Sequence, residues 1–184
     1  YLLSTFDFNT FTQSQPLSNS GNNLGICGMT GKVIAVSNGG LIKETSDLQT
    51  WTSQTSGTTV NLHSAITING VYYILGASGT YLTSYDGTTW TVRSIGASID
   101  IYDMTMNADK NLFVAVGSAG SIYSSINPIA DSPVWTLRTS NVTTDLTKII
   151  YNSSTYYVYG KAGTILKSTD GLSWTNINSV TTST

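Results

Sequence analysis

The sequence repeats itself with a period of about forty residues, and this period constrains the fold more than any other feature. An aromatic residue closes each copy, at intervals of 40, 39, 45 and 39 residues. An acid precedes it by four residues, except in the fourth copy, where an amide stands eight residues upstream because "PIADSPV" lengthens the segment. The aromatic residues are Phe11, Trp51, Trp90, Trp135 and Trp174, and their polar partners are Asp7, Asp47, Asp86, Asn127 and Asp170.

Each full copy contains four short runs of β-branched and aromatic residues. In residues 59–97 these runs are "LHSAITI", "VYYILG", "GTYLTS" and "TWTVRSI", separated by Asn-Gly, Ala-Ser-Gly and Asp-Gly. No run keeps a 3.6-residue period, so we expect essentially no helix. Four strands in about 40 residues match one propeller blade. The sequence therefore predicts an all-β protein, a β-propeller of four-stranded antiparallel blades.

The repeat also predicts the organisation of the chain as a single propeller domain, residues 1–184. A half blade occupies residues 1–20, and full repeats occupy about 21–58, 59–97, 98–142 and 143–180. A half blade alone would leave exposed strand edges, which proteins avoid. We therefore expect that about 20 residues precede Tyr1 and complete a five-bladed ring. Two alternatives are that the chain is an arc of a larger propeller and that a partner chain supplies the missing strands. Supply by a partner would make the protein a homo-oligomer or part of a larger assembly.

Composition excludes several classes of partner. The net charge is −2 and only 10% of residues are charged, so no basic cluster is available for nucleic acid or anionic lipid. No apolar run reaches the ~18 residues of a membrane-spanning helix. The single Cys27 excludes an intramolecular disulfide and a cysteine-rich metal site. We predict a protein or a glycan as the partner, with no nucleic acid and no membrane insertion.

The phrase Ser/Thr-x-Asp-Gly-x-x-Trp, as in Ser168 to Trp174, resembles the Asp-box of bacterial neuraminidase repeats. With "GKAGTILKS" before it, the segment is similar to propellers of the photosystem-stability-factor type in the sialidase-like superfamily. The resemblance covers almost the whole chain and is weakest in the first copy. It implies that the box is a structural hairpin between the third and fourth strands of a blade, without chemistry of its own. The box residues are Asp7, Asp47, Trp51, Asp86, Gly87, Trp90, Asn127, Trp135, Asp170, Gly171 and Trp174.

Elementary chemistry explains why these residue types suit such a hairpin. A carboxylate at a turn accepts hydrogen bonds from nearby backbone N–H groups, and the following glycine adopts positive φ without strain. The Ser or Thr two residues earlier can bond across the turn. We expect each tryptophan to place its large apolar ring between neighbouring blades.

The residue supply argues against an enzyme. Sialidases bind the substrate carboxylate with three arginines and use a tyrosine activated by a glutamate, whereas this chain has two arginines and one glutamate, Glu44. The single His63 has no Gly-x-Ser-x-Gly elbow to support a hydrolase site. No pair of histidines or cysteines is available to bind a metal ion. We predict no catalytic residue, no cofactor and no metal.

Candidate binding residues follow from the geometry of a propeller, in which the first strand of each blade lines the axis. Equivalent positions of successive blades then form rings: His63, Tyr102 and Thr147 in one, and Ser64, Asp103 and Lys148 in the next. Arg93 and Arg138 each stand three residues after a tryptophan, on outer strands. The candidates are His63, Tyr102, Asp103, Lys148, Arg93 and Arg138.

Low charge and a surface rich in Ser, Thr and Asn favour a non-catalytic binding or structural module in an extracellular or virion setting, such as a phage-tail adhesion component that recognises glycan or protein. The alternative is an assembly or stability factor for a protein complex, resembling the photosystem-stability proteins. A glycoside-active enzyme that uses Asp103 is a third, less favoured hypothesis.

Overall fold

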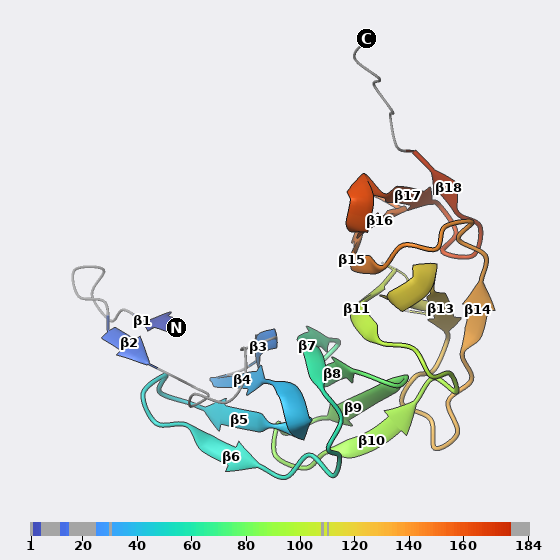
Figure 1. Ribbon diagram of the computed structural model, residues 1–184. Helices are drawn as coiled ribbons and strands as arrows, with labels where there is room; N and C mark the ends of the chain where they lie inside the picture. Colours follow the sequence, from blue (N-terminus) through green and yellow to red (C-terminus); the bar gives the residue numbers. More distant parts are fainter. Residues whose placement is uncertain are drawn as a thin grey trace. The chain divides into compact units, whose positions relative to one another are not determined.

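A computed structural model describes residues 2–4, 12–14, 25–29, 31–107, 109 and 111–177 (Figure 1). The described residues form four four-stranded antiparallel sheets and one two-stranded sheet. The fold is therefore the predicted all-β propeller architecture of four-stranded blades. Asp7 lies outside the described residues.

The strands follow the order expected from the repeat, since each sheet consists of four consecutive strands. Blade one contains β3 (Gly25–Met29), β4 (Lys32–Val36), β5 (Ile42–Thr45) and β6 (Thr52–Gln54), and blade two contains β7 (Leu62–Ile68), β8 (Val71–Gly76), β9 (Thr80–Ser84) and β10 (Thr91–Ser94). Blade three contains β11 (Ile101–Met106), β12 (Phe113–Gly117), β13 (Ile122–Ser125) and β14 (Thr136–Arg138). Blade four contains β15 (Leu146–Asn152), β16 (Thr155–Gly160), β17 (Ile165–Ser168) and β18 (Thr175–Asn176). The two-stranded sheet pairs β1 (Leu2–Ser4) with β2 (Thr12–Ser14).

The chain divides into two compact units. The first unit contains blades one and two and comprises Tyr1–Ala77 and Tyr81–Arg93. The second unit contains blades three and four and comprises Ser78–Thr80 and Ser94–Thr184. The expected single domain stays a prediction.

Within each unit, the core lies between the two blades. We call the side of a blade that faces the preceding blade its inner face, and the side that faces the following blade its outer face. In unit one, the outer face of blade one packs against the inner face of blade two, and the core residues are Ile34, Val36, Ile42, Leu62, Ala65, Tyr72, Ile74 and Leu82. In unit two the equivalent residues are Val114, Val116, Ile122, Leu146, Ile149, Tyr156, Val158, Leu166 and Trp174. Burying one large side chain of this kind contributes about 1.5–3 kcal/mol.

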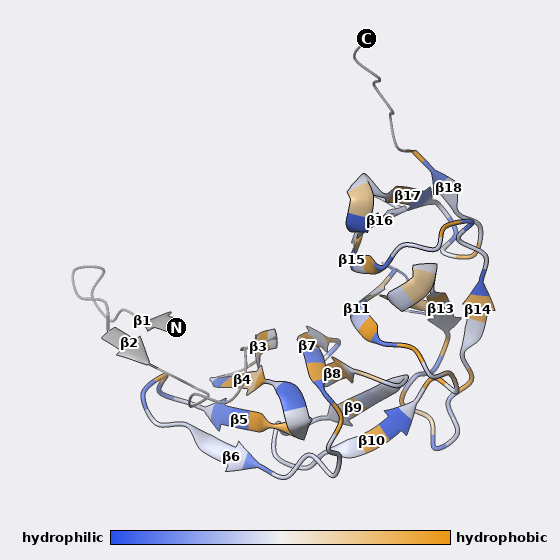
Figure 2. Ribbon diagram, in the orientation of Figure 1, coloured by the Kyte–Doolittle hydropathy of each residue, from blue (hydrophilic) through white to orange (hydrophobic). Residues whose placement is uncertain are grey.

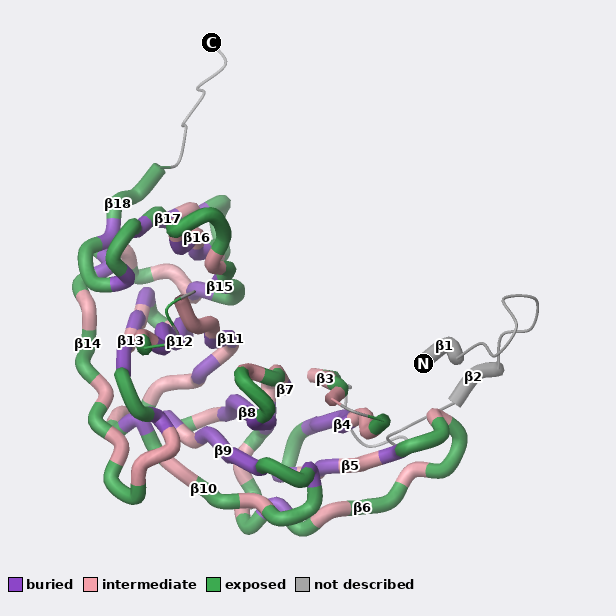
Figure 3. The backbone as a smooth tube through the Cα atoms, turned by 180° about the vertical axis from the view of Figure 1, so that it is seen from behind, coloured by how far each residue is buried: buried purple, intermediate pink, exposed green. Residues whose placement is uncertain are grey.

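Exposure and hydropathy change across each blade. The outer strands β6, β10 and β14 are exposed or half-buried, whereas β8 is buried along its whole length (Figure 3). In strand β5, burial does not alternate from residue to residue, because two half-buried residues lie between the buried Ile42 and Thr45. The strand combines the apolar Ile42 with hydrophilic residues (Figure 2). Most of the buried apolar side chains therefore lie on the first three strands of each blade.

The first strand of blades two, three and four contains a bulge of one residue. Leu62 pairs with Gly76 and Ser64 pairs with Leu75, so His63 has no opposite residue in the ladder. The pairing skips Tyr102 in β11 and Thr147 in β15 in the same way. A bulge redirects the extra side chain and bends the strand. The ring positions predicted from the sequence are therefore structurally equivalent.

Three-residue turns connect the second and third strands, and they are the only helical segments among the described residues. They are 3-10 turns at Asn38–Gly40, Ser118–Gly120 and Lys161–Gly163. Gly120 has a φ of 71°, and a Cβ atom there would collide with the carbonyl oxygen of Val142. Both the backbone angle and the close approach therefore require glycine. The expectation of essentially no helix is confirmed.

Candidate functional site

The Asp-box turn of blade two forms a compact set of local hydrogen bonds. Asp86 Oδ1 accepts the backbone N–H groups of Thr88 and Thr89 at 2.8 and 2.7 Å. Ser84 Oγ donates to Asp86 Oδ1 at 2.9 Å and accepts the backbone N–H of Gly87 at 2.9 Å. The hairpin expected from the sequence is confirmed, with both side chains binding the turn that contains them.

The same arrangement recurs in blades one and four. Asp47 Oδ1 accepts two backbone N–H groups at 2.8 Å and the Thr45 hydroxyl at 2.9 Å. Asp170 Oδ1 likewise accepts two backbone N–H groups at 2.8 Å and the Ser168 hydroxyl at 2.9 Å. In blade three, Ser125 Oγ accepts the backbone N–H of Asn127 at 3.2 Å, the counterpart of the bond from Asp170 to Ser168.

These hydrogen bonds keep the box carboxylates ionised. Backbone N–H groups lower the pKa of Asp47 and that of Asp170 to about 2, and they lower the pKa of Asp86 as well. Such carboxylates are occupied by their own turns, which supports a structural role for the box.

Two of the box tryptophans lie between neighbouring blades, as expected. The Trp90 ring lies 6.2 Å from the Tyr72 ring, and the Trp174 ring lies 6.1 Å from the Tyr156 ring, with the same interplanar angle of 59° in both pairs. Trp90 packs on the core of unit one, and Trp174 belongs to the core of unit two. Trp51 and Trp135 are half-buried.

The box glycines fit against the same tyrosine rings. A Cβ atom on Gly87 would lie 3.3 Å from the Tyr72 ring, and one on Gly171 would lie 3.0 Å from the Tyr156 ring. Both glycines also have positive φ, 72° and 71°. The glycine of the box therefore serves the packing of the hairpin as well as its backbone conformation.

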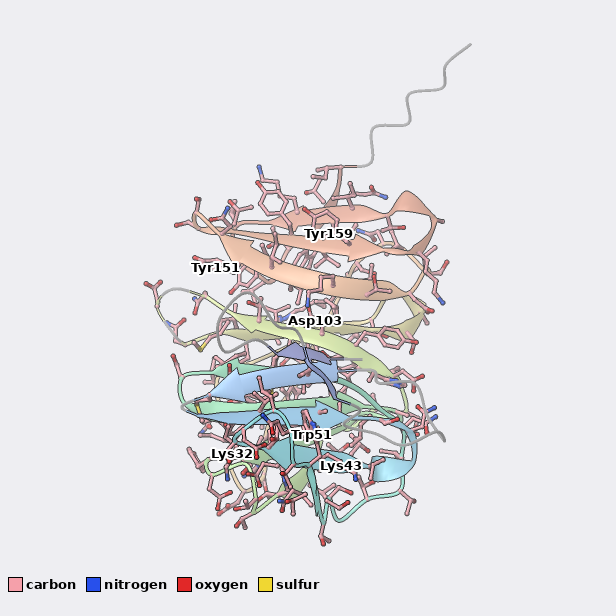
Figure 4. All side chains as sticks on the ribbon, turned by 90° about the vertical axis from the view of Figure 1, so that its left-hand side faces the viewer. Lys32, Lys43, Trp51, Asp103, Tyr151 and Tyr159 are labelled. Carbon is pink, nitrogen blue, oxygen red and sulfur yellow. The ribbon has the colours of Figure 1, made fainter. Side chains whose placement is uncertain are left out.

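A buried carboxylate joins the first strands of blades three and four. Asp103 is only 2% exposed, and its Oδ2 accepts the backbone N–H of Ile149 at 2.9 Å. Lys148 Nζ lies 3.1 Å from the same oxygen. Burial raises the pKa of Asp103, while the Ile149 N–H and the Lys148 charge oppose this increase. Asp103 is labelled in Figure 4.

Further charges surround Tyr102, the bulge residue beside Asp103. Lys161 Nζ lies 2.7 Å from Asp145 Oδ2, and Asp145 Oδ1 accepts the backbone N–H of Ala119 at 3.1 Å. Burial raises the pKa of the half-buried Tyr102, and the negative charges of Asp145 and Asp100 raise it further. The Lys161 bond lowers the pKa of Asp145. We call Tyr102, Asp103, Asp145, Lys148 and Lys161 the axial cluster.

Sequence reasoning missed a set of polar residues that bind the turns after earlier second strands. Asn61, Asp100 and Asp145 each stand just before a first strand. Their side-chain oxygens accept backbone N–H groups from the turn after an earlier second strand, those of Gly39, Ser78 and Ala119. Their backbone carbonyls accept the N–H groups of Ala77, Ser118 and Lys161. Asn61, Asp100 and Asp145 are separated by 39 and 45 residues, the same intervals that separate Trp51, Trp90 and Trp135. This shared spacing could have predicted them from the sequence.

The predicted candidates fall into both units. Tyr102, Asp103 and Lys148 come together in unit two, whereas the half-buried His63 lies on β7 in unit one.

The two arginines are fixed by their own blades. Arg93 Nε donates to Thr83 Oγ1 at 3.0 Å in unit one, and Arg138 Nε donates to Ser124 Oγ at 2.8 Å in unit two. Each bond joins the fourth strand of a blade to its third strand.

Within the described residues, no group of three or more His, Cys, Asp or Glu side chains is placed to bind a metal ion. No helix among them is long and apolar enough to cross a membrane. Burial raises the pKa of Cys27 to about 12, so its thiol stays protonated at neutral pH.

Comparison with solved structures identifies similar folds. One is YCF48 bound to D1 peptide, with 18% identity and a TM-score of 0.64 over 82% of this chain and 51% of that chain. A second is YCF48 from Cyanidioschyzon merolae, with 13% identity and a TM-score of 0.64 over 91% of this chain and 62% of that chain. A third is the computationally designed Ika4 protein, with 14% identity and a TM-score of 0.62 over 85% of this chain and 98% of that chain.

No family model and no curated protein matches the sequence. The likeness to YCF48 therefore shows the β-propeller fold alone, and it confirms the resemblance to photosystem-stability propellers at that level. The resemblance to the Asp-box stays a prediction from the sequence motif. The chain spans 51% and 62% of the lengths of the two YCF48 chains.

Proposed function

We propose that this chain is a non-catalytic β-propeller module that binds a segment of a partner protein and acts in the assembly or stability of a protein complex. The fold is shared with YCF48, one structure of which contains a D1 peptide. This comparison supports the assembly-factor hypothesis over the adhesion hypothesis. An extracellular or virion location stays a prediction from composition.

The axial cluster is the observation on which the proposal rests. It presents two ammonium groups from blade four, with the side chains of Lys148 and Lys161 60% and 68% exposed. Each is positioned by a carboxylate on one side, so its remaining N–H donors are available to a ligand. Carbonyl and carboxylate oxygens of a peptide are acceptors of the required kind.

The carboxylates of the cluster support binding rather than catalysis. Asp103 is tied to the Ile149 N–H and to Lys148, and Asp145 is tied to the Ala119 N–H and to Lys161. A general acid or base must be free to exchange a proton with a substrate. Both groups instead hold neighbouring blades together.

An array of synthetic peptides graded in net charge tests the proposal. Fluorescently labelled protein should bind acidic peptides, and both Lys161→Ala and Tyr102→Phe should weaken this binding. Lys167→Ala is the matched control, because Lys167 is an exposed lysine of blade four outside the cluster. Retention of full binding by both cluster variants would refute the axial placement. Loss of binding only in an Arg93→Ala/Arg138→Ala variant would move the site to the outer strands.

A further inference from the structure

Unit one uses a lysine side chain to join its two blades. Lys32, the first residue of β4 and labelled in Figure 4, donates from Nζ to the backbone carbonyl of Asp86 in blade two at 2.9 Å. Glu44 Oε1 lies 3.6 Å from the same Nζ. A Cβ atom on Gly87 would lie 2.9 Å from Lys32 Cδ, so the alkyl stem packs on the glycine of the box. The seam between blades one and two therefore contains an internal ammonium group.

Unit two has a leucine at the position of this lysine. Leu112 is equivalent to Lys32, because the residue after each of them pairs with the Ser or Thr of the box. Ser124 likewise stands at the position of Glu44. Both members of the ion pair in unit one are thus replaced by neutral residues at the seam between blades three and four.

Two carboxylates border an open hollow of about 740 Å³ at this second seam. Asp109 is exposed on the turn between β11 and β12, and Asp170 belongs to the box of blade four. None of the described residues that line the hollow carries a positive charge. Its apolar wall includes Ile126 and Leu172, which are 78% and 41% exposed. We call Asn107, Asp109, Leu112, Ile126, Asp170 and Leu172 the seam hollow.

A buried hydroxyl group beside the hollow has no hydrogen-bond partner among the described residues. It belongs to Tyr156, which is 1% exposed. The equivalent residue of unit one is Tyr72, since each tyrosine pairs with the serine of its own box. The Tyr72 hydroxyl donates to the Met29 carbonyl at 3.0 Å. Because an unsatisfied buried polar group is costly, the Tyr156 position favours a ligand that supplies a hydrogen-bonding group.

The hydroxyl end of Tyr156 is directed to the wall of the seam hollow. A Cβ atom on Gly171 would lie 3.2 Å from the Cζ atom of Tyr156 and 2.8 Å from Leu112 Cδ2. Burial, together with the nearby charges of Asp109 and Asp170, raises the pKa of Tyr156 to about 12. The half-buried Leu112 side chain adjoins the hydroxyl, and a change of its rotamer opens the hydroxyl to a ligand.

We propose that the seam hollow binds a lysine side chain of a partner protein, in the place that Lys32 takes in unit one. The ammonium group donates to the Asp170 carbonyl, as that of Lys32 does to the Asp86 carbonyl, and the two carboxylates balance its charge. A further N–H of the ammonium group is available to the Tyr156 hydroxyl. The alkyl stem covers the apolar wall, which a bare metal ion would leave uncovered.

This site goes beyond the proposed function, because it differs in place and in charge. The axial cluster lies where β11 begins and takes acidic groups, whereas the seam hollow lies where β11 ends and takes a cation. Binding of acidic peptides and binding of a lysine side chain can therefore each fail without the other.

A titration followed by NMR of the isotope-labelled protein tests the proposal. The probe is a capped Gly-Lys-Val tripeptide, which copies residues 31–33. We expect saturable shifts of the Gly171 and Leu172 amide signals at millimolar concentrations, and none with a matched peptide that carries norleucine in place of lysine. Asp109→Asn should weaken binding about threefold, as expected for an exposed ion pair. Leu112→Lys should abolish binding, because its own ammonium group then takes the place of the ligand.

Two tyrosine variants separate binding from folding. Tyr156→Phe should weaken binding of the lysine peptide about threefold without a loss of thermal stability, because its hydroxyl has no partner to lose. Tyr72→Phe is the matched control: it loses the bond to the Met29 carbonyl, so it should melt at a lower temperature and bind the peptide normally. A Tyr156→Phe variant that melts lower and binds like the wild type would contradict the assigned role.

Several results would overturn the proposal. These are unchanged Gly171 and Leu172 signals with the lysine peptide, equal shifts with the norleucine peptide, or full affinity in Leu112→Lys. Equally tight binding of pentylamine would assign the hollow to a small amine, and shifts with calcium chloride alone would assign it to a metal ion. Binding that appears only in Lys110→Ala would assign the hollow to the chain's own Lys110, which adjoins Asp109 in the sequence.

Discussion

Ser168 offers a sharp test of the Asp-box hydrogen bonds. Its Oγ accepts the backbone N–H of Gly171 at 2.8 Å and that of Asp170 at 3.3 Å, and it donates to Asp170 Oδ1. Ser168→Ala removes all three bonds while it changes the side-chain volume little. Gly171 is buried, so its N–H loses its acceptor with no access to water.

The cost follows from these contacts. An unsatisfied buried donor costs about 1–3 kcal/mol, whereas the N–H of the exposed Asp170 can bind water instead. We therefore expect Ser168→Ala to lower the free energy of unfolding by about 2 kcal/mol. Ser168→Thr is the matched control, because Thr45 makes the same three bonds in blade one at 2.9, 3.0 and 3.3 Å. It should change stability by less than about 0.5 kcal/mol.

Urea unfolding followed by tryptophan fluorescence measures both variants, and an unchanged m-value verifies that the unfolding transition is the same. Hydrogen exchange at the Gly171 amide should accelerate in Ser168→Ala and not in Ser168→Thr. An alanine variant as stable as the wild type, or a threonine variant as damaged as the alanine one, would contradict the assigned hydrogen bonds.

Three further predictions concern packing, pH and backbone. Trp174→Ala should lower the free energy of unfolding by about 3–5 kcal/mol in calorimetry, because the ring is a buried core residue. The folded-state pKa of Asp170, about 2, lies below its unfolded value, so its contribution is complete above the unfolded pKa and is lost as pH falls through about 2. Urea midpoints measured down to that pH should drop more steeply for the wild type than for Asp170→Asn. Gly120→Ala should destabilise more than Gly39→Ala in thermal melts, since both glycines have positive φ but only the Cβ atom at residue 120 collides with a carbonyl oxygen, that of Val142, and equal losses would refute the steric argument.

The sequence predicted the blade architecture because its signals are local. Asp86, Gly87 and Trp90 lie within one hairpin, and the chemistry that joins them acts over four residues. The equivalence of His63, Tyr102 and Thr147 also followed from simple alignment of the repeats, whereas their bulge was seen only in the structure. Short-range patterns of this kind appear in any single copy and are reinforced by the others.

The connecting residues Asn61, Asp100 and Asp145 were missed for the opposite reason. Asn61 binds a backbone N–H of Gly39, 22 residues away, so no local pattern reveals the bond. The position also accepts either an amide or an acid, because only an acceptor oxygen is needed. Asp103 illustrates the same limit: its ring position was predicted, but its burial and its bond to the Ile149 N–H depend on the spacing between two blades.

The bulges in the first strands of blades two, three and four separate the chemistry of one surface position from the packing of the core. The register of the ladder skips His63, Tyr102 and Thr147, so their side chains do not follow the alternation that fixes the apolar faces. Imidazole, phenol and hydroxyl groups already occupy this one position in three successive repeats. Exchange of these residues should therefore change the surface chemistry of one repeat at a time and leave the apolar core of the blades intact.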